Sequence, residues 1–111
     1  MNRNKLIDLF IGNMSNCIIH KILEKAIEDE NIRDHYNKEL LESLNIAIRY
    51  REKINPNLKP LPEKDINYIR ERIIRKVNAE LKLRISKGYK NIDLKSVELI
   101  VDEMLSQTKV I

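Results

Sequence analysis

The sequence predicts an all-α protein, and three observations support this prediction. Apolar residues recur at intervals of three and four along most of the 111-residue chain. No segment alternates apolar and polar residues over more than a few positions, as a half-buried strand would. All three prolines fall within residues 56–62, so the rest of the chain is free of them. We therefore expect a single domain, residues 1–111, built as a bundle or an orthogonal array of four to five helices.

The first helical region, residues 3–30, changes the direction of its apolar face. At 100° per residue, the apolar side chains of residues 6–14 lie on one arc. Those of residues 19–27 lie on an arc rotated by about a quarter turn. Because one straight helix would present only one arc to a single core, we expect a break at Gly12-Asn13. Asn13 is then the candidate N-cap of the second piece.

The next helix is predicted over residues 31–54. Asn31 and Asp34 have the spacing of a capping box, although aspartate is shorter than the usual glutamate. Leu41 and Ile46 widen the apolar face beyond a single stripe. We therefore expect this helix to occupy the centre of the fold.

Residues 55–62 contain the three prolines and predict an extended, polyproline-like linker. The linker divides the chain into two helical halves, residues 3–54 and 63–106.

The helix after the linker, predicted over residues 63–86, has the clearest pattern. Pro62 suits the first turn, and Glu63 and Asp65 complement the positive end of the helix dipole. Gly88 suits a left-handed C-cap. The apolar stripe consists of Ile66, Ile69, Ile73, Val77, Leu81 and Ile85.

A last, shorter helix is predicted from Leu94 to about residue 106, with Asp93 as its N-cap. Residues 107–111 are expected to fray. Because this helix is about half as long as the one before it, some apolar surface on the longer helices can remain uncovered. Such a patch usually marks self-association or a partner groove, unless the N-terminal helical piece fills it.

The net charge of +4 is concentrated in residues 63–92, which hold nine basic and four acidic residues. Six basic residues form a predicted basic face: Arg72, Arg75, Lys76, Lys82, Lys87 and Lys90. This face suits nucleic-acid phosphates or an acidic protein, and the alternative is a solvated helix face that maintains solubility. Arg84 follows Glu80 by four residues and is expected to pair with it. Arg70 is expected to pair with an acidic residue elsewhere or to extend outward to solvent.

The last two helices are not expected to act as a DNA-binding helix-turn-helix. Glu98, Asp102 and Glu103 lie on the helix that would enter the groove, with only Lys95 as a basic residue. Acidic side chains are repelled by the phosphates that line a DNA groove.

Cys17, His20 and Glu24 share one helix face by their spacing and form the strongest candidate for chemistry. A metal site needs more ligands than these provide, and the other histidine, His35, lies beyond the predicted boundary at Asn31. A cysteine on an apolar helix face is usually a small buried residue. We therefore expect no metal, no cofactor and no catalytic residue.

Composition excludes several further classes. One cysteine excludes an internal disulfide framework and a Cys-based zinc finger. With Gly12 and Gly88 as the only glycines, neither a P-loop nor a dinucleotide fingerprint can be formed. The amphipathic stretch of residues 3–11 is a candidate for a membrane surface, but a core helix is the preferred interpretation. No segment is expected to span a bilayer, and the protein is expected to be cytoplasmic.

These observations predict a non-catalytic helical interaction module that forms a homo-oligomer or joins a larger assembly. The alternative is a nucleic-acid-binding protein that uses the basic face. A third hypothesis, an enzyme with a Cys17/His20 site, requires an accessible thiol. No small-molecule substrate is inferred.

Overall fold

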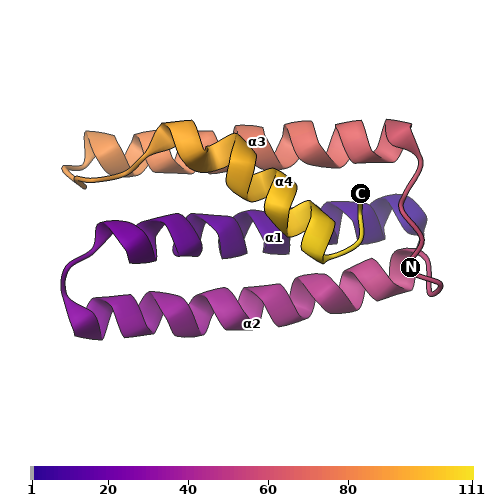
Figure 1. The fold of residues 1–111 in the computed structure, drawn as a ribbon, viewed down its shortest axis with the longest axis horizontal. Helices are drawn as coiled ribbons and strands as arrows, with labels where there is room; N and C mark the ends of the chain where they lie inside the picture. The colour runs from indigo at the N-terminus through magenta and orange to yellow at the C-terminus, as the bar shows by residue number, and fades with distance from the viewer. Residues whose placement is uncertain (1) are drawn as a thin grey trace.

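The computed structural model describes residues 2–111, which form four α-helices and one short 3₁₀-helix and contain no strand. The elements are α1 (Arg3–Ala26), α2 (Glu30–Ile54), α3 (Glu63–Ser86), the 3₁₀-helix η1 (Leu94–Ser96) and α4 (Val97–Gln107). Figure 1 shows α1, α2 and α3 along the long axis, with α2 antiparallel to the other two and α4 crossing obliquely. The prediction of an all-α bundle is therefore confirmed.

The central helix is α1, and the expectation that residues 31–54 occupy the centre is wrong. Eleven of the 24 residues of α1 are buried. In α2, only Ala47 and Arg51 are buried among 25 residues. α2 and α3 pack on different sides of α1 (Figure 1). A wide apolar face on α2 therefore did not indicate a central position, because Leu41 and Ile46 on that face are exposed.

α1 is continuous through Gly12-Asn13, where a break was predicted. Both of its apolar arcs are buried, because neighbours cover it from more than one side. Asn13 caps no helix, and its amide donates to the carbonyl oxygen of Leu9 at 2.8 Å within α1. The change in apolar direction is thus accommodated within one continuous helix that has neighbours on more than one side.

The first two helices begin at polar caps that satisfy their free backbone N–H groups. The side chain of Asn2 accepts from the backbone of Lys5 at 2.8 Å. The side chain of Asp29 accepts from Asn31 at 2.9 Å and from Ile32 at 3.3 Å. The cap of α2 is therefore Asp29, two residues before the predicted Asn31, and its carboxylate also complements the helix dipole.

α3 begins and ends at the predicted residues, and η1 begins at the predicted cap. Pro62 directly precedes α3, and residues 55–62 lie outside the helices. The first part of this segment is a turn and not the predicted extended linker, because the N–H of Leu58 donates to the carbonyl oxygen of Asn55 at 3.0 Å. Gly88 has a φ of 99°, a left-handed conformation that favours glycine. Tyr89 N–H donates to the Arg84 carbonyl oxygen at 3.1 Å, which closes the end of α3. The side chain of Asp93 caps η1 by accepting from Lys95 at 2.9 Å.

The C-terminal residues are docked on the bundle, which contradicts the expected fraying of residues 107–111. Thr108 and Val110 are buried. The backbone N–H of Leu61 donates to the carbonyl oxygen of Val110 at 3.0 Å. The guanidinium of Arg51 donates to the carbonyl oxygens of Thr108 and Lys109 at 3.0 and 2.5 Å. The tail is therefore fixed by contacts to α2 and to the proline-containing segment.

By length and composition alone, α1 is long and apolar enough to cross a membrane, whereas no segment was expected to span a bilayer. Its most apolar 18-residue window has a mean hydropathy of 1.2. Within the described fold, 61% of that window is buried. The core helix of a water-soluble protein meets the same criterion, so α1 serves as the centre of the core here.

Candidate functional site

The six residues of the predicted basic face are all exposed. Among residues 2–111, none of their side chains lies within ion-pairing distance of a carboxylate. Arg72 and Lys76 point along the flank of α3 that faces α1, since both line a hollow between these helices. The guanidinium of Arg72 also lies 5.1 Å from the centre of the Tyr68 ring. The structure thus divides the basic face into a groove-lining part and an outer part.

The other arginines of α3 are paired, as predicted. Arg84 Nε contacts the carboxylate of Glu80 at 2.9 Å. Arg70 Nε contacts the carboxylate of Asp102 on α4 at 2.8 Å. The acidic partners raise the pKa of both guanidinium groups, mainly through these hydrogen bonds. The pair of Arg70 with Asp102 therefore joins α3 to α4, and the pair of Arg84 with Glu80 lies within α3. Neither arginine contributes to the basic face.

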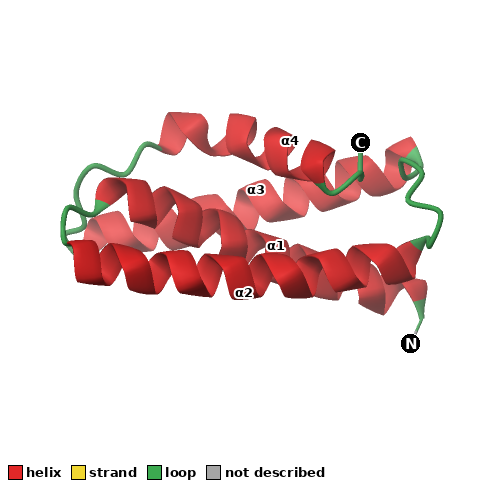
Figure 2. Ribbon diagram, turned by 60° about the horizontal axis from the view of Figure 1, so that its bottom comes forward, coloured by secondary structure: helices red, strands yellow, loops and turns green. Residues whose placement is uncertain are grey.

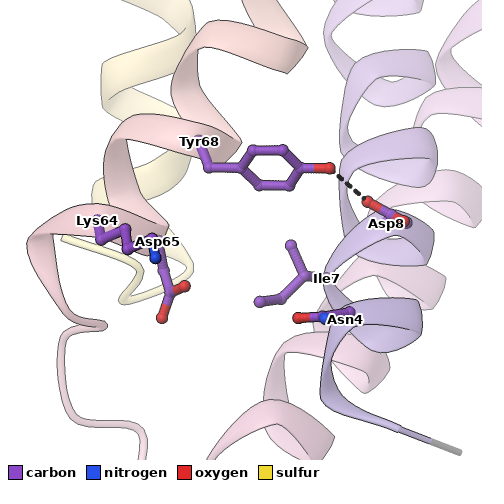
Figure 3. Close-up of a pocket in the computed structure, with 6 residues that line it drawn as sticks. All are labelled: Asn4, Ile7, Asp8, Lys64, Asp65 and Tyr68. Carbon is purple, nitrogen blue, oxygen red and sulfur yellow. Dashed lines mark hydrogen bonds between the residues drawn. The ribbon is translucent and has the colours of Figure 1, made fainter.

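A polar groove that was not predicted from the sequence runs between α1 and α3. At its N-terminal end, Tyr68 donates to the carboxylate of Asp8 at 3.0 Å across the groove (Figure 3). Arg3 pairs with Asp65 beyond this point. Both bridges join residues about 60 positions apart in two parallel helices. Equivalent turns of α1 and α3 are therefore neighbours along the groove.

Residues four positions apart line both walls of the groove. The α1 wall carries Asn4, Asp8, Gly12, Asn16 and His20, and the α3 wall carries Lys64, Tyr68, Arg72, Lys76, Glu80 and Arg84. Each row is visible in the sequence as a polar stripe with helical spacing. Only the parallel packing of α1 and α3 shows that the two stripes face one groove.

A cluster of titratable side chains closes the other end of this groove. The carboxylate of Glu39 on α2 contacts His20 Nε2 at 2.9 Å and His35 Nε2 at 2.8 Å. The ring of Tyr36 stacks on that of His20 with a centroid separation of 5.7 Å. Burial lowers the pKa of His20, with Arg84 adding to the effect and Glu39 opposing it. His20 and His35 lie on either side of the predicted boundary at Asn31, and the antiparallel packing of α1 and α2 brings them to the same carboxylate.

The candidate chemical set of Cys17, His20 and Glu24 does not converge on one site. Cys17 is fully buried, and burial raises the pKa of its thiol to about 11. His20 faces the groove between α1 and α3, whereas Glu24 lines a different groove between α1 and α2. Among the described residues, no group of three or more histidine, cysteine, aspartate or glutamate side chains is arranged to hold a metal ion.

Large exposed apolar side chains lie on both flanks of the side of α2 that packs on the core. Figure 2 shows α2 in front of the bundle, with its outer side open. The exposed apolar residues of α2 are Ile32, Leu41, Ile46 and Ile48. Leu99 on α4 is also exposed, at 63% of its surface. α2 is therefore the helix with the largest number of uncovered apolar side chains among the described residues.

No protein-family model matches this chain, and neither a curated protein nor a solved structure matches it.

Proposed function

We propose that this protein is a non-catalytic helical interaction module that self-associates through α2. The observation that supports this proposal is the exposure of Ile32, Leu41, Ile46 and Ile48 on a helix that buries only two of its residues. Leu41 and Ile48 are seven residues apart and lie on one side of α2, whereas Ile32 and Ile46 lie on the opposite side. Removing apolar surface from water favours association, so the side with Leu41 and Ile48 is the proposed contact.

The charge distribution along α2 favours a second copy of this chain as the partner. Within α2, residues 30–42 hold four acidic and two basic residues, whereas residues 43–54 hold one acidic and three basic residues, of which Arg51 is buried. Two α2 helices that pack antiparallel place the acidic half of one against the basic half of the other. Such a contact is the same on both protomers and closes as a two-fold dimer. Complementary charge also orients the encounter.

The burial of the Cys17 thiol supports the non-catalytic part of this proposal. An enzyme based on Cys17 requires a reactive thiolate, and this thiol is buried with a raised pKa. We further infer that the chain acts as one domain, in which segment 55–62 joins two helical halves. The bonds from Arg51 and Asn55 to the carbonyl oxygen of Lys59, at 2.8 and 3.1 Å, support a fixed connection.

Sedimentation equilibrium of the purified protein tests this proposal. We expect a reversible dimer for the natural chain and a monomer for the double variant Leu41→Glu/Ile48→Glu, because two charges enter the apolar contact. The matched control is Leu99→Glu, which places the same charge at an exposed apolar position on α4 and should leave the dimer intact. Circular dichroism checks that each variant remains helical. A monomeric natural chain, or an unchanged dimer in the double variant, would refute self-association through α2.

A second candidate function is nucleic-acid binding by the outer part of the basic face. The observation that favours it is that Arg75, Lys82, Lys87 and Lys90 are exposed and have no carboxylate within ion-pairing distance among the described residues. Neutralising phosphates with such side chains releases counterions, so affinity falls steeply with salt.

Fluorescence anisotropy with a labelled DNA duplex at several salt concentrations tests this candidate. Arg75→Glu/Lys82→Glu should abolish binding, whereas Lys38→Glu/Arg49→Glu on α2 makes the same change of charge and should retain most of it. Equal loss in both variants would indicate a response to net charge alone. No binding by the natural chain at low salt would exclude the candidate.

A further inference from the structure

The middle of the groove between α1 and α3 has the size and chemistry of a small ligand site. It contains a hollow of about 500 Å³, within the range of about 300–1,000 Å³ that is usual for small-molecule pockets. Its walls are the stripes of residues four positions apart that α1 and α3 place side by side. The inference is independent of self-association through α2, because α2 lies on a different side of α1.

Gly12 creates open space at the middle of this groove. It lies within the continuous helix α1, where glycine weakens the helix and no left-handed backbone requires it. A Cβ atom added at Gly12 would meet no other atom within 4 Å. Internal packing therefore does not explain glycine at this position, whereas room for a bound group does.

Two cations on the α3 wall near the open space have no carboxylate partner. Lys76 lines the hollow beside Gly12, and Arg72, one turn earlier on α3, lines the adjoining hollow together with Lys76. Among residues 2–111 neither side chain lies within ion-pairing distance of an acidic group. The amide of Asn16 lines the α1 wall and adds a further donor. An anion in this space would gain charge-assisted hydrogen bonds, which are the strong class.

A buried hydroxyl in the same wall independently points to a missing partner. Ser15 is 2% exposed, and its Oγ has no hydrogen-bond partner among the described residues. Ser15 lines the groove. Buried polar atoms in native proteins are almost always hydrogen-bonded, so this hydroxyl is an unsatisfied group in a residue that lines the hollow.

The carboxylates at the two ends of the hollow limit the ligand to a compact anion. Asp8 lies toward one end and Glu80 toward the other, and both line the groove. A nucleic-acid backbone that follows the groove would bring successive phosphates against these carboxylates. A single phosphate group fits between them. We propose that the groove between α1 and α3 binds a phosphate-bearing small molecule or free phosphate beside Gly12, held by Arg72 and Lys76.

Amide chemical-shift titration with two probes, inorganic phosphate and glycerol 3-phosphate, tests this proposal. We expect saturable shifts centred on Gly12 and Asn16 with at least one probe. If glycerol 3-phosphate binds more tightly than inorganic phosphate, the rest of the hollow contacts the organic part of the ligand. Equal affinity assigns recognition to the phosphate group alone. If neither probe gives saturable shifts at these residues, the proposal is wrong.

Three variants separate a defined site from general attraction by a basic helix. Arg72→Gln/Lys76→Gln should weaken binding by about tenfold or more, because hydrogen bonds to charged groups are lost. Gly12→Leu should weaken it similarly by filling the open space, and its helical content should be retained because leucine is a strong helix former. Arg75→Gln/Lys82→Gln removes the same charge from the outer side of α3 and should leave the affinity within about threefold. An equal loss in this control, or unchanged binding in Gly12→Leu, would overturn the site.

Discussion

Arg51 is one of the largest side chains that the fold buries completely, and its charge is held by oxygen dipoles alone. Its guanidinium donates to the side chain of Asn55 at 2.9 Å and to the carbonyl oxygens of Lys59, Thr108 and Lys109 at 2.5–3.0 Å. Burial lowers its pKa. A buried charge is tolerated only when its hydrogen bonds are made, so these contacts depend on one another. One residue of α2 therefore holds both the proline-containing segment and the C-terminus.

His20 makes the stability of the fold depend on pH near neutrality. Burial, together with the nearby Arg84 and His35, lowers the folded-state pKa of His20 below its ordinary value, and Glu39 opposes this only in part. As the pH falls through about 6.5, the unfolded chain binds a proton that the folded protein resists. The contribution of His20 to the free energy of unfolding is therefore fully present at neutral pH. It is lost as the pH falls toward the pKa that His20 has in the folded protein. We expect the urea midpoint to decrease between pH 7.5 and pH 5.5.

A pair of histidine variants identifies the group responsible. His20→Gln removes the half-buried imidazole and should flatten the pH dependence of the urea midpoint. His35→Gln keeps His20 and should keep the dependence. If His20→Gln follows the same curve as the natural chain, another group controls the pH response.

At the scale of the element, the continuity of α1 gives a direct test of its central glycine. Gly12 is helical and has open space around it, so Gly12→Ala should raise the free energy of unfolding by about 0.5–1 kcal/mol. Gly88 provides the opposite case, because its φ of 99° strains any residue with a Cβ atom. Gly88→Ala should therefore destabilise the protein. Urea unfolding measures both variants, and a helix broken at Gly12 would show no gain in Gly12→Ala.

Element positions were predictable from the sequence where the signals are local. The φ of Gly88, the cap at Asp93 and the pair between Arg84 and Glu80 all involve residues within a turn or two of each other. The start of α2 was misplaced because Asn31 and Asp29 are both good caps, and only the observed bonds select Asp29. Exposure of the basic face also followed from helical periodicity alone.

Features that join distant segments could not be predicted in the same way. Arg49 and Arg51 look alike in the sequence, but only Arg51 meets carbonyl oxygens 57 and 58 positions away. The contact of Glu39 with His20 depends on how α1 and α2 pack, which a pattern of apolar residues does not specify, whereas its contact with His35 is a local pair within α2. The groove between α1 and α3 depends likewise on their parallel register.

At the scale of the whole molecule, the fold closes by joining its C-terminus to the segment between α2 and α3. The bond from Leu61 to Val110 and the bonds from Arg51 to Thr108 and Lys109 connect these regions. The pattern of apolar residues did not predict these contacts, because the short C-terminal tail has no helical periodicity. The consequence is that a tail expected to fray contributes to the stability of the entire bundle.

Removal of residues 108–111 should therefore destabilise the whole protein. Full burial of Val110 alone contributes about 1.5–3 kcal/mol, and the guanidinium of Arg51 would lose two acceptors in addition. We expect a loss of about 3 kcal/mol or more in urea unfolding, monitored by circular dichroism. Removal of the exposed Ile111 alone is the control and should change the free energy of unfolding little.

Arg51→Met should give a similar loss of stability in the full-length chain. Its combination with the truncation should cost less than the sum of the two, because both changes disrupt the same contacts. Additive losses would show that the tail and Arg51 stabilise the bundle independently.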